Sequence, residues 1–220
     1  RTGRSKSMTQ DSRAVLADWK HTLSFWGQMK EAKYPIVSAR SDGARLWDVD
    51  GNEYIDVALG MGVHFFGHRP PFIHDALSRQ MKCGLELGTQ SKLTGTVAQL
   101  VHDLTSSERV AFGNTGSEAV MVAIRLARAA TGRSRIVIFK NAYHGIFDGV
   151  LATEDDEGGV RPIGIGTPPA MIEDVMVMEY GAAESLRLIE QQADSIAAVL
   201  VEPVQSRDPA LQPQGFLQAL

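Results

Sequence analysis

Hydrophobic and polar positions follow two alternating periods along most of the chain. Helical spacing and short apolar runs succeed one another, with helices expected at 72–82, 93–104, 117–130 and 182–193 and strands at 109–112, 135–139, 175–179 and 196–201. Strands that are apolar throughout and alternate with helices are typical of a parallel sheet covered on both faces. The pattern therefore predicts an α/β fold, a mostly parallel sheet with helices on both faces. The stretch 153–170, rich in Gly and Pro, is expected to be a long loop.

The first third of the chain has a different pattern. Residues 13–33 carry an amphipathic stripe that is typical of a helix. Two short apolar runs, 44–49 and 54–57, are joined by an Asp-Gly turn, which is a strong hairpin signal. We therefore expect a small N-terminal α+β segment over 1–68 that contributes to a small domain, and a larger α/β domain over 69–220.

Composition excludes several classes of function. The 220 residues include 22 Lys and Arg and 26 Asp and Glu, which gives a net charge of −4 and a pI near 5.9. A surface for nucleic acid or anionic membrane needs a basic excess, which is absent. No run of 18 apolar residues and no signal-type start is present. The one cysteine, Cys83, excludes an internal disulfide and a cysteine-based metal cluster, so we expect a reducing cytoplasm.

The two ends do not look like natural ends. The chain starts at Arg1 rather than at a methionine, and residues 1–12 are polar and expected to be loose. The last five residues, 216–220, read as the opening of a helix. We therefore expect this sequence to be a piece of a longer chain.

The turn 113–118, Gly-Asn-Thr-Gly-Ser-Glu, lies between a predicted strand and a predicted helix. Glycines let the backbone approach an anion, and the first N–H groups of a helix are unpaired donors at the positive end of its dipole. A phosphate there would accept bonds from Gly116, Ser117 and the Ser117 hydroxyl. A capped helix after a tight turn explains these residues equally well on their own. The spacing fits neither a Walker P-loop nor a dinucleotide site, so a small monophosphate cofactor suits it best.

Two further segments follow neighbouring predicted strands. Tyr143 and His144 come after the strand 135–139, where an aromatic ring could lie flat on a planar heterocycle and the histidine could order the loop. A tyrosine in such a loop is also commonly a packing residue. Glu202 closes an apolar strand, so its carboxylate must find a partner or reach a solvent-filled cleft. A structural pairing with an arginine is the alternative for this glutamate.

Taken in order, these segments carry a family resemblance. The motifs are Gly-His-x-Pro at 67–70, Asn-Thr-Gly-Ser-Glu-Ala-Val at 114–120, Arg-Leu-Ala-Arg-Ala-Ala-Thr-Gly-Arg at 125–133, Tyr-His-Gly at 143–145 and Val-Glu-Pro-Val at 201–204. Their order and spacing, from about residue 36 to the end, resemble class III aminotransferases of fold type I, the group that includes glutamate-1-semialdehyde aminomutase. Ser117 departs from the family's usual threonine, but the hydroxyl is retained.

The resemblance implies the cofactor pyridoxal 5'-phosphate (PLP) and an amino-acid donor with a keto or aldehyde acceptor. Gly116 and Ser117 would bind the phosphate of PLP, with Asn114 and Thr115 shaping the turn. The family's usual assembly implies a homodimer for the complete enzyme.

The resemblance also assigns residues to the ring and to the substrate. Tyr143 would stack on the pyridine ring, with His144 beside it. Glu202 would lie near the ring's 3-hydroxyl side or orient the catalytic groups. The substrate would be bordered by the loop residues Gly60, Met61 and Gly62.

A finer resemblance concerns one branch of the family. Ser5-Lys6 with Gln10, the run 34–37 and above all the segment 202–207 (Glu-Pro-Val-Gln-Ser-Arg) resemble aminotransferase domains of polyketide synthases and hybrid peptide synthetases. In those systems the acceptor is a β-ketoacyl chain on a carrier protein. The alternatives are a free-standing aminomutase-like enzyme and a non-catalytic relative. A Rossmann-type dehydrogenase is disfavoured by the glycine spacing.

Two parts of the family's machinery are not matched in this sequence. The Asp that keeps the pyridine nitrogen protonated and the Lys that forms the Schiff base would both lie beyond Leu220. Lysines occur at positions 6, 20, 30, 33, 82, 92 and 140, none in a matching context. Lys140 is near the predicted cleft, and we assign it no catalytic role.

We therefore predict that residues 1–220 by themselves are inactive. After incubation with PLP and reduction with borohydride, mass spectrometry should find no lysine that carries the cofactor, and no transamination should be measurable. A single modified lysine together with turnover would contradict this prediction.

Overall fold

The computed structural model describes residues 1–17, 33–85 and 88–220. The described chain divides into two compact units, Arg1–Lys92 and Leu93–Leu220, which are described here one at a time. The predicted boundary after residue 68 remains a prediction. Within the described residues, no helix is both long and apolar enough to cross a membrane.

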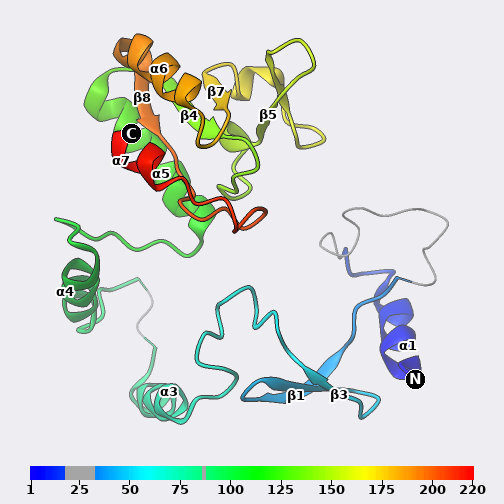
Figure 1. Cartoon of the computed structure of the whole chain (residues 1–220). Helices are drawn as coiled ribbons and strands as arrows, with labels where there is room; N and C mark the ends of the chain where they lie inside the picture. Colours follow the sequence, from blue (N-terminus) through cyan, green and yellow to red (C-terminus); the bar gives the residue numbers. More distant parts are fainter. Residues whose placement is uncertain (18–32, 86–87) are drawn as a thin grey trace. The chain divides into compact units, whose positions relative to one another are not determined.

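The first unit contains a small antiparallel sheet. Its elements are α1 (Gly3–Ser12), β1 (Ser38–Asp42), β2 (Arg45–Asp48), β3 (Glu53–Ile55) and α3 (Pro71–Cys83). The strand order is β1-β2-β3, with Leu46 opposite Tyr54 (Figure 1). This confirms the predicted hairpin and the helix at 72–82. The polar strand β1 was not predicted, since its sequence lacks the apolar positions that mark a strand.

The extreme N-terminus is a helix, so the prediction of a loose end is wrong. The N–H groups of Arg4 and Ser5 donate to the two carboxylate oxygens of Asp50, at 2.8 and 3.0 Å. An anion at the start of a helix satisfies orphan donors and interacts favourably with the helix dipole. Because Asp50 is 45 or more residues away in sequence, no local pattern predicts this helix. Of the helix predicted at 13–33, residues 13–17 are non-helical and 18–32 lie outside the described residues.

The second unit contains the predicted parallel sheet. Its elements are α4 (Thr94–Thr105), α5 (Gly116–Thr131), β4 (Arg135–Phe139), β5 (Ala152–Glu154), β6 (Val160–Pro162), β7 (Val175–Met178), α6 (Ala183–Gln191), β8 (Ile196–Val199), α7 (Gln214–Ala219) and the short 3-10 helices η2 (Asp148–Val150), η3 (Pro169–Met171) and η4 (Ala193–Ser195). The strand order is β7-β4-β8, and both strand pairs are parallel. The predicted α/β class is confirmed.

Strand β4 has a separate hydrophobic core on each of its faces. Ile136 and Ile138 pack with Ile124 of α5, while Val137 and Phe139 pack with Phe216 of α7. Residues of α6 join the second core, so α5 covers one face of the sheet and α6 and α7 cover the other (Figure 1). Alternate side chains of a strand point to opposite faces, so a strand buried on both faces must be apolar at every position. The predicted two-sided covering is therefore confirmed.

Two predictions in this unit are wrong. Residues 109–112 form no strand, because no described strand provides a hydrogen-bonded partner for them. The stretch 153–170 is not a plain loop, because it contains most of the β5–β6 hairpin and η3. The Asp155 carboxylate accepts from the N–H groups of Glu157 and Gly159, which closes the hairpin turn. An aspartate that accepts from nearby backbone N–H groups stabilises a turn, here in a stretch whose sequence pattern predicts only a loop.

Candidate functional site

A capping box begins helix α5 at the predicted phosphate turn. Thr115 is the N-cap residue, and its hydroxyl accepts from the Glu118 N–H at 3.1 Å. The Glu118 carboxylate accepts in return from the N–H groups of Asn114 and Thr115, at 2.7 and 3.2 Å. The Thr-x-x-Glu pattern is a capping signature that can be read directly from the sequence. Asn114 and Thr115 therefore shape the turn with donors that are already in use.

The next two N–H groups of the helix are open. In the part of the chain that the structure describes, the N–H groups of Gly116 and Ser117 donate to no protein acceptor. A Cβ atom built on Gly116 would meet no atom within 4 Å, so the backbone there faces open space. These two donors lie at the positive end of the α5 dipole, which is the arrangement that binds phosphate at helix starts.

The side chain of Ser117 joins α5 to the loop that follows β4. We call residues 140–146 the tyrosine loop. Its Ile146 N–H donates to the Ser117 hydroxyl oxygen at 3.0 Å, which leaves the hydroxyl proton free to donate elsewhere. Gly145, with φ of 89°, passes so close that a Cβ there would lie 3.0 Å from Ser117 Cα and collide with the hydroxyl oxygen. Only glycine fits this approach.

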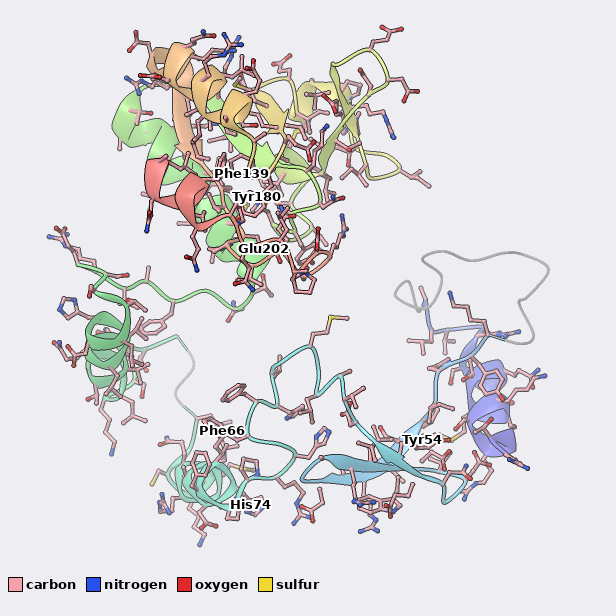
Figure 2. The ribbon with its side chains drawn as sticks, viewed as in Figure 1. Tyr54, Phe66, His74, Phe139, Tyr180 and Glu202 are labelled. Carbon is pink, nitrogen blue, oxygen red and sulfur yellow. The ribbon has the colours of Figure 1, made fainter. Side chains whose placement is uncertain are left out.

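Glu202 joins the tyrosine loop to the loop that follows β8. We call residues 202–206 the glutamate loop. One Glu202 carboxylate oxygen accepts from the Tyr143 N–H and the other from the Ser206 N–H, each at 2.9 Å. Burial opposes ionisation of Glu202, but the hydrogen bonds from Tyr143 and Ser206 outweigh it and lower the pKa of this carboxyl. Figure 2 shows Glu202 at the end of the sheet near the start of α5.

The two rings of the tyrosine loop differ in their surroundings. Tyr143 is 55% exposed. His144 is half-buried, and within the described residues its Nε2 atom is buried without a hydrogen-bond partner. Burial lowers the pKa of His144, and the nearby charge of Glu202 opposes that shift only in part. A neutral imidazole nitrogen with no partner is a candidate for contact with a further polar group.

Lys140 is held by two carboxylates. Its Nζ lies 2.5 Å from Glu154 and 2.8 Å from Glu179. The hydrogen bonds to these glutamates raise its pKa above the ordinary value of 10.5, which stabilises the ammonium form. A nucleophilic lysine needs a free amine, so this geometry agrees with assigning no catalytic role to Lys140.

The predicted substrate residues, Gly60, Met61 and Gly62, belong to the first unit. All three have positive φ, of 63°, 56° and 90°, and Met61 is thus in a conformation that favours glycine. The preceding Asp56 accepts from the N–H groups of Ala58 and Leu59, and its other oxygen lies 2.8 Å from His68 Nε2. The loop is thereby tied at both ends, and its role at a substrate remains a prediction.

The structure brings the other predicted site residues together at one end of the parallel sheet. The start of α5 contacts the tyrosine loop through Ser117, and that loop contacts the glutamate loop through Glu202. Sequence reasoning missed Glu118, Tyr180 and Gln205, which support these segments. Glu118 carried a capping signal and Gln205 belongs to the 202–207 motif, but no local pattern indicated the contacts of Gln205 with Lys140 or of Tyr180 with Pro203.

Solved structures define the class of this fold. An omega-transaminase from Sphaerobacter thermophilus is 32% identical, with a TM-score of 0.85 over 97% of this chain and 50% of that chain. A glutamate-1-semialdehyde aminomutase from Pseudomonas aeruginosa is 25% identical, with a TM-score of 0.84 over 99% of this chain and 48% of that chain. The chain therefore has the fold of the fold type I transaminases.

Sequence comparison then gives the family. The profile of the aminotransferase class-III family matches residues 27–220. A curated relative, the glutamate-1-semialdehyde 2,1-aminomutase of Chloroflexus aggregans, is 40% identical over 193 residues, which are 84% of this chain and 44% of the relative. The chain belongs to the class III aminotransferase family, and it spans about half the length of the curated relatives it matches.

The lowered pKa of Glu202 predicts a pH-dependent contribution to stability. Because the folded-state pKa lies below the ordinary value of 4.5, this contribution is present above that value and is lost as the pH falls through the folded-state pKa. The difference in free energy of unfolding between the natural chain and Glu202→Gln should therefore shrink on acidification. Urea titrations from neutral to acidic pH measure it.

The matched control for this prediction is Glu108→Gln, an exposed glutamate outside the site. The free energy of unfolding of this variant should stay within about 0.5 kcal/mol of that of the natural chain at every pH. The prediction would be contradicted if the difference in free energy of unfolding between Glu202→Gln and the natural chain did not change with pH.

Proposed function

We propose that this chain supplies the phosphate-binding part of a PLP-dependent aminotransferase, which moves an amino group from an amino-acid donor to a keto or aldehyde acceptor. The observation that carries the proposal is the pair of open N–H groups at Gly116 and Ser117, at the start of a capped helix. Membership of the class III family supports the same assignment.

The residues present fit the phosphate of PLP. Gly116 N–H, Ser117 N–H and the Ser117 hydroxyl are three donors, and the space over Gly116 is open. Asn114 and Thr115 shape the turn through their bonds to Glu118 and are not themselves open donors. When bound, PLP supplies an electron sink, while the protein supplies orientation and charge.

The tyrosine and glutamate loops would serve the pyridine ring. The exposed ring of Tyr143 is available for stacking, and its backbone is fixed by Glu202. Each Glu202 oxygen has a second lone pair, so the carboxylate can still accept a bond from a ring substituent. The buried Nε2 of His144 would meet a polar group of the loaded site. Gly60, Met61 and Gly62 would border the substrate.

The lysine that carries the cofactor would lie outside residues 1–220. The ion pairs of Lys140 with Glu154 and Glu179 support this, because they hold the lysine of the tyrosine loop as an ammonium ion. The complete enzyme would act as a homodimer in the cytoplasm. The single cysteine, which excludes an internal disulfide, supports the cytoplasmic location.

For the acceptor we propose a β-ketoacyl chain on a carrier protein, in a polyketide or lipopeptide synthase. The support is the Glu-Pro-Val-Gln-Ser-Arg segment at 202–207, which resembles the aminotransferase domains of such enzymes. The second candidate is a free-standing enzyme similar to glutamate-1-semialdehyde aminomutase, supported by the names of the curated relatives. A non-catalytic module is the third, and the residues that follow this segment in the parent protein would decide it.

The phosphate assignment predicts the effect of Ser117→Ala in the full-length protein. Loss of one hydrogen bond to a charged group costs about 1.5–3 kcal/mol, so the dissociation constant for PLP should rise about 10- to 100-fold. Ser117→Thr should recover most of the affinity, because the hydroxyl is restored. Equilibrium dialysis or fluorescence titration measures the constant.

The control is Ser134→Ala, which removes the hydroxyl of an exposed serine outside the turn. Its affinity for PLP should match that of the natural protein within about 2-fold. Unchanged binding by Ser117→Ala would refute the phosphate site, and absence of transamination by the natural full-length protein would refute the proposed activity.

The acceptor proposal predicts a preference that kinetics can measure. With the full-length protein and an amino-acid donor, kcat/KM for a β-ketoacyl chain on its carrier protein should exceed that for glutamate 1-semialdehyde by about 100-fold. The opposite preference would favour the free-standing enzyme. The free β-ketoacid is the control that separates recognition of the acyl chain from recognition of the carrier protein.

A further inference from the structure

Gln205 is a fully buried polar side chain in the glutamate loop. It is 1% exposed and ranks with Phe139 and Ile136 among the most deeply buried large side chains of the described residues. Its amide nitrogen donates to the backbone carbonyl of Lys140 at 2.9 Å, across 65 residues of sequence. Burial of an amide is unfavourable unless it is hydrogen-bonded, so this contact must be formed for the loop to take its observed place.

Lys140, whose carbonyl accepts that bond, is itself held by three contacts at the end of β4. The Lys140 N–H donates to the Met178 carbonyl at 2.8 Å, and its side chain pairs with Glu154 and Glu179. These bonds fix Lys140 to β7 and to β5. Gln205 therefore attaches the glutamate loop to a point that the sheet already holds.

Tyr180 makes a second attachment of the same loop. Its hydroxyl donates to the Pro203 carbonyl at 2.8 Å, and its ring packs on Phe139 and Phe216 with centroid distances of 5.4 and 5.6 Å. Figure 2 shows Phe139 and Tyr180 together in the interior, with Glu202 nearer the end of the sheet. The loop that carries Glu202 is thus held on either side of Val204, at Pro203 and at Gln205.

These attachments set where the Glu202 carboxylate meets the tyrosine loop. Glu202 is one residue from Pro203 and three from Gln205, and it accepts from the Tyr143 N–H at 2.9 Å. A shift of the glutamate loop would move this acceptor away from Tyr143. The ring of Tyr143 would then lose the backbone contact that fixes its position.

We propose that Gln205, assisted by Tyr180, is a positioning residue of the active site: it acts through Glu202 to place Tyr143 against the cofactor. The inference rests on the proposed function and adds residues that touch neither cofactor nor substrate. The mechanism is geometric, since a displacement of about 1 Å at a catalytic site can reduce the rate about 100-fold.

The test uses the full-length enzyme loaded with PLP and the variant Gln205→Met, which keeps the length of the side chain but removes the amide donor. We expect kcat to fall about 10- to 100-fold, KM for the amino donor to stay within about 3-fold, and the visible circular-dichroism band of the bound cofactor to weaken. A merely structural role would reduce stability and leave the band and the kcat per loaded, folded molecule unchanged. That result would overturn the inference.

The matched control is Gln218→Met, at an exposed position of α7. It should leave kcat, KM and the cofactor band unchanged within about 2-fold. If the natural enzyme itself neither binds PLP nor transaminates, the proposed function fails. If the natural enzyme is active and Gln205→Met behaves like the control, this inference alone fails.

Two further variants test the route of the effect. Tyr180→Phe keeps the packed ring and removes only the hydrogen bond to Pro203, so it should also lower kcat. This variant tests the inference even if Gln205→Met does not fold. In a Glu202→Ala background the group to be positioned is gone, so Gln205→Met should lower kcat less than about 2-fold further. An unchanged kcat in Tyr180→Phe, or the full additional loss in the double variant, would overturn the inference.

Discussion

Burial of β4 on both faces is the constraint on which the second unit depends. Side chains 136–139 are all buried, in two cores to which α5 contributes on one face and α6 and α7 contribute on the other. A strand in this position has hydrogen bonds to β7 and β8 along both edges, so its end is fixed in three dimensions. The tyrosine loop begins at that end. Its position is therefore set by the hydrophobic core.

Polar groups at the end of the sheet are satisfied by one another, with a few exceptions that coincide with the candidate site. Glu118 accepts hydrogen bonds from the N–H groups of Asn114 and Thr115. Glu202 accepts hydrogen bonds from those of Tyr143 and Ser206. In the described part of the chain, the remaining open groups include the two N–H donors at the start of α5 and the Nε2 atom of His144. A buried polar atom without a partner, such as His144 Nε2, is rare, and the open donors at a helix start are the groups that commonly bind an anion, so both support a cofactor site.

The charge distribution also bears on the proposed chemistry. Among the residues of the second unit, no lysine or arginine side chain hydrogen-bonds to the turn 113–118, so the helix dipole, the backbone donors and the Ser117 hydroxyl would hold the phosphate. The cation at the end of β4, Lys140, is committed to Glu154 and Glu179 and serves as a structural anchor.

Elements and motifs that depend on near neighbours could be predicted from the sequence. The period of apolar residues predicted α5 and β4, and the Thr-x-x-Glu pattern at 115–118 contained the capping box. The order of motifs also predicted the family, which the comparisons confirm.

Contacts between distant residues were decided by the tertiary structure alone. The α1 helix depends on Asp50, the closure of the site depends on bonds that span 29 to 65 residues, and Gln205 is buried because the sheet brings Lys140 beside it. A strand at 109–112 was predicted from its composition, yet a strand also needs a partner. Local patterns specify which face of a helix or strand is apolar. Hydrogen bonds between loops form only where the two cores have fixed the positions of the strand ends.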